Sequence, residues 1–157
     1  MSAFTFLGFE YLTDGEILLL LCEKAPPDDA KGYVPAYKYV IMSGGRLAGR
    51  CDIRIGESEA TRLGGNIGYE VFPEFRGNNY AEKACRLLGQ VAKAHGMKRL
   101  VITCNPDNFA SRKTCENLGA RLTHIANLPP HSEMYALGER RKCVYVWNIQ
   151  KGSRPSL

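Results

Sequence analysis

The sequence predicts an α/β domain in which a mixed sheet is covered by helices on both faces. Its length of 157 residues suits one compact core, and 45% hydrophobic with 24% charged residues is typical of globular proteins. The predicted order of elements is strand, helix, hairpin, strand, helix, strand, helix, strand, strand, which is typical of an α+β arrangement around a mixed sheet. We expect a single domain over residues 1–150 and a C-terminal tail over residues 151–157.

The first elements are assigned from local composition. Residues 4–12 are rich in Phe, Tyr and Thr, which favours a strand. Asp14 then stands where it can cap a helix over residues 17–25, which Pro26 would end. The loop 26–36 that follows, with several prolines, is either a substrate-lining loop or a plain connection.

A hairpin and the clearest helix follow. Alternating polar and apolar residues predict strands over 37–41 and 47–55, joined at Gly44 and Gly45. A further strand covers residues 66–72. The next helix has an apolar face with the i, i+3, i+4, i+7 spacing and ends at Gly96; this face consists of Ala81, Ala84, Cys85, Leu88, Val91 and Ala92.

The remaining elements complete the sheet. Residues 100–104 begin with an apolar run that predicts a buried central strand. Asp107 or Asn108 then caps a helix over 109–118, and Gly119 ends it. Two closing strands are expected, joined by a proline-rich loop; the ranges are 122–128, 143–149 and 129–139.

Composition excludes several classes of protein. The longest apolar run, residues 17–22, is too short to span a membrane, and the N-terminus lacks the basic and small-residue pattern of a signal peptide. We therefore expect a cytoplasmic protein without membrane contact. The net charge of +5 favours anionic partners such as phosphates, nucleic acid or a phosphorylated cofactor, and does not choose among them.

Neither the cysteines nor the histidines have the spacing of a metal site. There is no CxxC pair among the six cysteines, so we interpret them as reduced core residues. We predict no metal.

The block of residues 68–81 carries the strongest chemical signal, because it joins a strand to the clearest helix through an exposed loop. The first amides of that helix have no acceptor within the helix and carry partial positive charge, so they attract anions. Gly77 allows close approach to the main chain, and Arg76 offers a charged fork that matches phosphate oxygens. The block predicts a phosphate-binding site.

Two motifs resemble the GNAT superfamily of N-acetyltransferases. The run from Arg76 to Ala81, RGNNYA, is similar to the signature in which Arg or Gln is followed by two residues, Gly, one residue, and Gly or Ala. In the second block, Asn108, Ser111 and the pair Leu118-Gly119 have the family's spacing. The resemblance is clear over residues 66–123. It implies the acyl-CoA N-acyltransferase fold, with splayed central strands and flanking helices.

The resemblance also implies acetyl-coenzyme A (acetyl-CoA) as the acetyl donor. Its pyrophosphate would bind the amides of residues 77–81, and its pantetheine arm would pair with main-chain groups of Glu70 and its two successors, where the strand splays. The implied cofactor-binding residues are Val71, Phe72, Arg76, Gly77, Asn78, Asn79, Tyr80, Ala81, Asn108 and Ser111.

Two departures from the family pattern affect the chemistry. Asn79 replaces the central glycine of the signature, and Asn tolerates unusual backbone angles. Cys115 stands where many members carry the Tyr that serves as general acid. Cys115 is one candidate acid, although a cysteine packed in the helix is the favoured interpretation, and Tyr135 is a further candidate donor or substrate contact.

The remaining catalytic roles follow from the chemistry of amine acetylation. An ammonium has a pKa of about 10.4 and must lose a proton before it attacks a thioester. Glu70 is the candidate base; the alternatives are that it forms a salt bridge or is simply exposed. The amide of Val71 or Phe72 is expected to stabilise the oxyanion of the tetrahedral intermediate.

We therefore expect an N-acetyltransferase that acts by direct attack of a primary amine, either a protein N-terminus or a small-molecule amine. The alternatives are a non-catalytic acyl-CoA-binding sensor of the same fold and a basic nucleic-acid-binding module. Nucleic acid is disfavoured because basic motifs interleaved with aromatic residues are lacking. A homodimer is left open.

Overall fold

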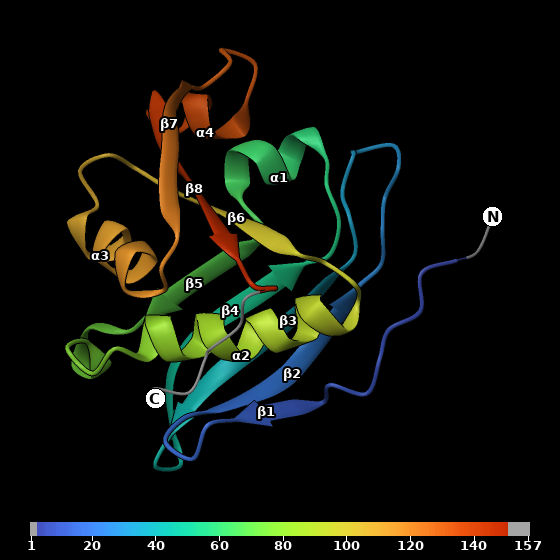
Figure 1. Ribbon diagram of the computed structural model, residues 1–157, viewed down its shortest axis with the longest axis vertical. Coiled ribbons are helices and arrows are strands. Elements are labelled where there is room, and N and C mark those ends of the chain that lie inside the picture. The colour runs from blue at the N-terminus through green and yellow to red at the C-terminus, as the bar shows by residue number, and fades with distance from the viewer. Residues whose placement is uncertain (1–2, 151–157) are drawn as a thin grey trace.

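The strands of the protein form two separate antiparallel sheets that meet at one point (Figure 1). The computed structural model describes residues 3–150, so the predicted tail lies outside the described residues. The larger sheet has the order β1-β2-β3-β4-β5. Its strands are β1 (Tyr11–Thr13), β2 (Leu18–Ala25), β3 (Ala36–Ser43), β4 (Arg46–Arg54) and β5 (Ile67–Val71).

The smaller sheet has the order β6-β8-β7 and follows the long helix in the chain. Its strands are β6 (Arg99–Cys104), β7 (Arg121–Asn127) and β8 (Arg141–Asn148). The helices are α1 (Glu59–Gly64), α2 (Tyr80–Ala94), α3 (Phe109–Asn117) and α4 (Glu133–Ala136), with a 3-10 turn, η1 (Pro73–Phe75), before α2. This mixed α+β architecture confirms the predicted fold class.

Asn66 joins the two sheets. Its amide donates to the carbonyl of Val101 at 2.6 Å, and the amide of Val101 donates to Asn66 Oδ1 at 2.9 Å. Asn66 Nδ2 donates to the carbonyls of Arg54 and Gly56. Beyond this point β5 and β6 diverge toward α3 (Figure 1), and no ladder joins them within residues 3–150. The predicted splay therefore begins at a buried, fully bonded Asn66.

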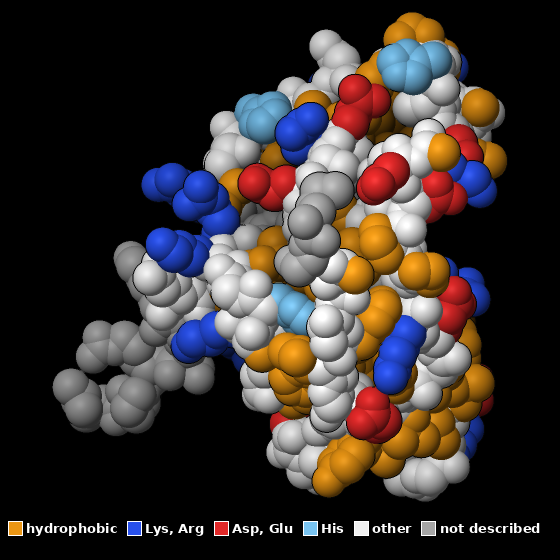
Figure 2. Space-filling view, turned by 90° about the vertical axis from the view of Figure 1, so that its right-hand side faces the viewer, with side chains coloured by type: hydrophobic (Ala, Val, Ile, Leu, Met, Phe, Trp, Pro, Cys, Tyr) orange, Lys and Arg blue, Asp and Glu red, His pale blue; other side chains and the backbone are white. Residues whose placement is uncertain are grey.

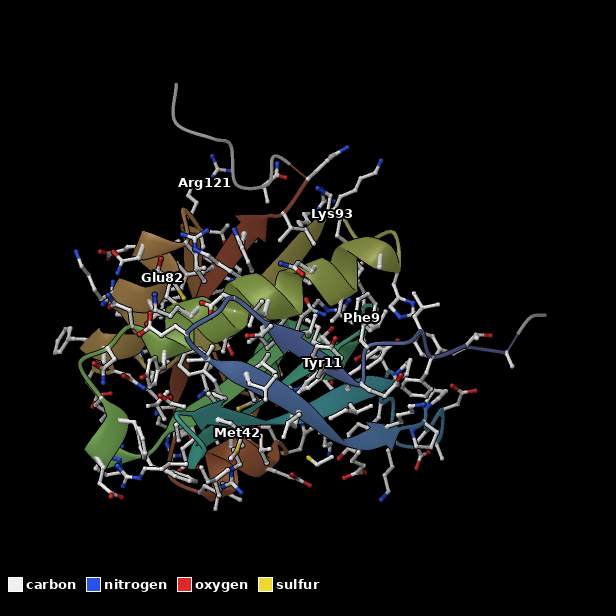
Figure 3. All side chains as sticks on the ribbon, turned by 90° about the horizontal axis from the view of Figure 1, so that it is seen from below. Phe9, Tyr11, Met42, Glu82, Lys93 and Arg121 are labelled. Atoms are coloured by element: carbon white, nitrogen blue, oxygen red, sulfur yellow. The ribbon has the colours of Figure 1, made fainter. Side chains whose placement is uncertain are left out.

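Helix α2 covers one face of the larger sheet, where it contacts β4 and β5. Its predicted apolar face is buried except for Ala81, which is half-buried, while Glu82 and Lys93 lie near its two ends (Figure 3). Gly89 brings the helix close to Trp147, because a Cβ at this position would stand 3.0 Å from the indole ring. The left-handed Gly96 and Gly119 follow α2 and α3 as expected. No described helix is long and apolar enough to cross a bilayer.

The expected helix over 17–25 is wrong, because this segment is strand β2. Asp14 Oδ1 accepts from the amides of Glu16 and Ile17 at 2.9 Å, so it closes a turn and caps no helix. Leu19 is buried and Leu20 is 39% exposed, an alternation that suits a strand. Pairing with β1 and β3 on both sides overrides the helix propensity of the leucine run.

Three further expectations need correction. The first strand is shorter than residues 4–12, since only β1 pairs with β2. The short helices α1 and α4 were not expected; Ser58 and Ser132 cap them. The larger sheet does not carry helices on both faces, because side chains such as Lys38 on the face opposite α2 are exposed.

The segment before β1 packs on the core through a small hydrogen-bonded cluster. Leu7 N–H donates to the Tyr37 hydroxyl at 2.7 Å, and that hydroxyl lies 2.7 Å from His95 Nε2. Since the Tyr37 oxygen already accepts a bond, its proton is directed at Nε2, and His95 accepts in its neutral form. The Phe4 ring stacks on His95 at 4.8 Å. On this side of the molecule, hydrophobic side chains remain visible between charged ones (Figure 2).

We predict that this cluster makes stability depend on pH. Burial lowers the pKa of His95 below its value in the unfolded chain. Neutral His95 therefore contributes fully to the free energy of unfolding above a pH of about 6.5, and this contribution is lost as the pH falls. Denaturant unfolding at a pH of about 7.5 and of about 5 measures the loss, and His95→Gln should flatten this dependence. His131→Gln, at an exposed site, is the control. If the free energy of unfolding of His95→Gln fell as steeply with decreasing pH as that of the wild type, the pH dependence would not come from His95.

Candidate functional site

The start of α2 has the geometry expected of an anion-binding loop. Gly77 has φ +87°, and Asn79 adopts the left-handed conformation with φ 60° as the N-cap residue of the helix. The Asn79 side chain makes no capping hydrogen bond. The first amides of α2 therefore remain free of side-chain caps and face the space in front of the helix. Asn79 therefore adopts the left-handed backbone conformation at the position where the signature has a glycine.

Side chains of the loop hold this arrangement in place. Asn78 Nδ2 donates to the carbonyl of Phe75 at 2.9 Å, which closes the turn after η1. Arg76 Nε donates to the carbonyl of Val71 at 3.1 Å, so the guanidinium lies between the end of β5 and the start of α2. The Tyr80 hydroxyl lies 2.7 Å from Ser43 Oγ and anchors the helix start to β3.

The free edge of β5 faces the gap that opens from Asn66. Phe72 donates its amide to Ala48 at 2.8 Å, and the carbonyl of Asn66 accepts from Arg54, so even-numbered residues of this segment bond β4. Because the main-chain direction alternates along a strand, Tyr69 and Val71 turn their amides and carbonyls toward the gap. The Phe72 amide is therefore engaged, which argues against its expected oxyanion role and favours Val71.

A tyrosine that was not predicted from the sequence bridges the gap to α3. The Tyr69 hydroxyl donates to Ser111 Oγ at 2.9 Å, and the Ser111 amide donates to Asn108 Oδ1 at 3.1 Å. Burial raises the pKa of Tyr69, so its hydroxyl keeps its proton. The alternation of side chains on either side of Glu70 is the sequence signal that could have placed Tyr69 on the helix side.

A cleft of about 560 Å³ runs from the start of α2 along β5 to α3. Of the predicted cofactor-binding residues, Phe72 and Asn78 do not line it; both hold the loop through hydrogen bonds with the main chain of Phe75. The cleft is lined by Val71, Arg76, Gly77, Asn79, Tyr80, Ala81, Asn108 and Ser111, together with Tyr69 and Glu70.

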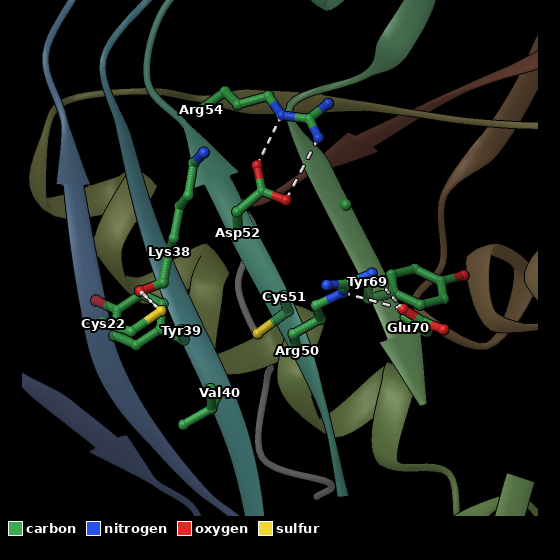
Figure 4. A pocket seen from close by; sticks show the side chains of 11 residues that line it. Cys22, Lys38, Tyr39, Val40, Arg50, Cys51, Asp52, Arg54, Tyr69 and Glu70 are labelled. Atoms are coloured by element: carbon green, nitrogen blue, oxygen red, sulfur yellow. Dashed lines mark hydrogen bonds and ion pairs between the residues drawn. The ribbon is translucent and has the colours of Figure 1, made fainter. Parts of the chain in front are cut away.

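A groove of about 580 Å³ lies on the face of the larger sheet opposite α2 (Figure 4). It shares Tyr69 and Glu70 with the cleft, so the two spaces adjoin at β5. Arg50 Nε and Nη2 contact Glu70 Oε1 at 3.0 and 2.9 Å. The expected base Glu70 is thus at the junction, and it also forms a salt bridge with Arg50, which was its alternative role.

A third cavity, of about 210 Å³, lies between β5 and β6. It shares Asn108 and Ser111 with the cleft and Gly68 with the groove, and Met134 of α4 also lines it. Tyr69 lines all three spaces. A donor bound in the cleft and an acceptor from either other space would therefore meet beside Tyr69.

The two candidate acids from the sequence lie away from this junction. Cys115 is fully buried on α3 and lines none of these three cavities. Burial raises the pKa of its thiol to about 12, which suits a packing role. Tyr135 lies on α4, where Arg140 stacks 3.7 Å from its ring, and its neighbour Met134 reaches the cavity instead. This geometry argues against both acid roles.

The described residues hold no cluster of three or more histidine, cysteine or acidic side chains suited to a metal ion. All six cysteines are free, and Cys22 alone among them is exposed.

Comparison with known proteins identifies relatives of this architecture. A family model described as "Acetyltransferase (GNAT) domain" matches residues 15–121. The structure of the microcin C7 self-immunity acetyltransferase MccE, in complex with acetyl-CoA and AMP, aligns at 25% identity with a TM-score of 0.58 and covers 73% of this chain. This chain spans 61% of the MccE structure.

Two further solved structures are also similar. The RimL ribosomal L7/L12 α-N-protein acetyltransferase aligns at 17% identity with a TM-score of 0.64, covering 89% of this chain and 94% of RimL. RimJ of Mycobacterium smegmatis, in complex with CoA-disulfide, aligns at 20% identity with a TM-score of 0.59, covering 76% of this chain and 56% of RimJ. No curated protein sequence matches this chain significantly.

Proposed function

Because this chain belongs to the GNAT acetyltransferase family, we propose that it transfers the acetyl group of acetyl-CoA to a primary amine by direct attack, without a covalent enzyme intermediate. The observation that carries the proposal is the free edge of β5, which leads from the start of α2 into the gap beside Tyr69. Unpaired strand amides attract a partner with alternating donors and acceptors, such as a pantetheine arm.

The chain's own groups fit the parts of acetyl-CoA. The amides at the start of α2 and the Arg76 guanidinium suit a pyrophosphate. The outward amides of Tyr69 and Val71 and the carbonyl of Tyr69 suit the amides of the pantetheine arm, whereas the carbonyl of Val71 is held by Arg76. The Val71 amide is then the donor nearest the thioester oxygen that gains negative charge during attack, which is where preorganised donors lower a barrier most.

Glu70 accepts the proton that the acceptor's ammonium must lose. Both contacts from Arg50 end on Oε1, which leaves Oε2 for the ammonium. The neutral amine then forms the new N–C bond while the C–S bond breaks and CoA leaves as a thiolate, and the second proton of the attacking nitrogen is lost to solvent as the amide forms. A carboxylate at the junction of cleft and groove can serve both spaces, which supports this role over a purely structural one.

Ser111 and Tyr69 together supply a proton to the leaving thiolate. Ser111 Oγ accepts from the Tyr69 hydroxyl, so its own proton is directed toward the cleft. Tyr69 can replace that proton along the same hydrogen bond, and solvent returns a proton to the Tyr69 oxygen, since burial disfavours a charged tyrosinate. A thiol pKa near 8.5 makes this assistance modest at neutral pH.

The acceptor is either a protein N-terminus or a small-molecule amine. RimL is described as acting on the N-terminus of a ribosomal protein and MccE as a self-immunity enzyme, which supports both classes. Activity in the cytoplasm is part of this proposal.

We predict that Glu70→Gln lowers kcat by about 10²-fold or more, because the amide cannot accept the ammonium proton. Release of free thiol from acetyl-CoA with a panel of amines measures the rate. Acetyl-CoA affinity should be little changed, since the Glu70 side chain lies on the groove side of β5.

Two results would count against this account. An unchanged rate in Glu70→Gln would remove Glu70 from the mechanism. If the wild-type protein bound acetyl-CoA and released no thiol above background with any amine, the alternative of a non-catalytic acyl-CoA binder would replace the proposed function.

We predict that Tyr69→Phe lowers kcat by about tenfold while the KM for acetyl-CoA changes little, because proton delivery is lost and ring packing is kept. The loss should shrink at lower pH, where the thiolate is protonated more readily from solvent. Cys115→Ala is the control, and it should lower the unfolding free energy with a rate near that of the wild type. A large rate loss in folded Cys115→Ala would restore Cys115 as the acid.

A further inference from the structure

The groove on the open sheet face holds two arginine–carboxylate pairs with different roles (Figure 4). Arg54 bonds Asp52 through Nε at 2.7 Å and Nη2 at 3.3 Å. Its Nη1 also donates to the carbonyls of Gly64 and Gly65 at 3.0 Å. This pair lies over Gly68, where a Cβ would stand 2.6 Å from Asp52 Oδ1. Asp52 and Arg54 are therefore fixed structural parts of the groove.

The second pair, Arg50 and Glu70, has no such support. Its side chains are 73% and 50% exposed, and Arg50 has no further hydrogen-bond partner among the described residues. Exposed ion pairs contribute little to stability and are readily replaced by a ligand of matching charge. Of the two arginine–carboxylate pairs in the groove, Arg50 and Glu70 thus form the one that is free to bind a substrate.

The charges in the groove disfavour an acceptor that carries only positive charge. Three cationic side chains, Lys38, Arg50 and Arg54, line it against the two carboxylates. Lys38 has only a loose contact of 3.8 Å with Glu23, which lies outside the lining. An ammonium on its own would compete with Arg50 for Glu70. An acceptor that also brings a carboxylate would satisfy both partners at once.

We propose that the acceptor carries a carboxylate close to its reacting amine, so that Arg50 binds the carboxylate while Glu70 binds the ammonium and takes its proton. Arg50 is then a specificity-determining residue: it holds Glu70 while the groove is empty and releases it to the correct substrate. The chemistry fits a free amino acid, or a peptide whose N-terminal residue is followed by Asp or Glu. This inference rests on the proposed acetyl transfer.

Matched acceptors test the proposal. One arm compares alanine with alaninamide, and the other compares two peptides that differ only in Asp or Asn at position 2; spermidine serves as a cationic acceptor without a carboxylate. We expect kcat/KM to be about tenfold or more higher for the carboxylate member in one arm, which identifies the source of the carboxylate. Spermidine should be a poor substrate.

Variants connect this preference to Arg50. Arg50→Gln should reduce the ratio between carboxylate and amide acceptors to about one, with the KM for acetyl-CoA unchanged. The ratio should fall because the carboxylate acceptor loses its binding partner and its KM rises. Arg121→Gln, an exposed strand arginine outside the groove, should retain the full ratio.

Three outcomes would overturn the proposal: amide acceptors reacting as fast as carboxylate acceptors in both arms, spermidine exceeding them, or an unchanged ratio in Arg50→Gln. Each of these leaves the proposed acetyl transfer intact, because thiol is still released. Absence of thiol release with every acceptor would instead contradict the proposed function, and this inference with it.

Discussion

The contact at Asn66 is the constraint on which the site depends. One buried side chain ties β4, the segment before α1, and β6, and from this point the two sheets separate. A buried amide is stable when all its polar groups are hydrogen-bonded. Beyond Asn66, β5 keeps an edge of unpaired main-chain groups, and burying these in an apolar core would cost free energy. Its main-chain groups are retained because they face a cleft, where a ligand can pair with them.

Every functional element is positioned relative to that divergence. Helix α2 starts at one end of the cleft with free amides, and α3 presents Ser111 across the gap. The alternation of β5 then places Tyr69 toward α3 and Glu70 toward the open groove, so neighbouring residues serve opposite sides of the reaction. A donor and an acceptor can therefore approach the same main-chain edge from separate spaces without competing for the same side chains.

The sequence predicted those parts of the site whose signals are local. The loop before α2, its apolar face, and the cap and stop of α3 follow from spacing and turn chemistry, and the splay followed from a family resemblance. Long-range pairing decided the rest: partners on both sides made residues 18–25 a strand despite their leucines, and the bond from Phe72 to Ala48 left Val71 as the free amide. Tyr69 was missed because its partner lies 42 residues away.

Residue-resolved amide hydrogen exchange with and without acetyl-CoA tests the central claim most directly. The amides of Gly68 and Glu70 already bond β4, so their protection should change little. Those of Tyr69 and Val71 should exchange quickly in the free protein and become strongly protected when acetyl-CoA binds. Acetyl-CoA binding that leaves the exchange of Tyr69 and Val71 unaltered would contradict the account, because the free edge of β5 would then have no part in holding the donor.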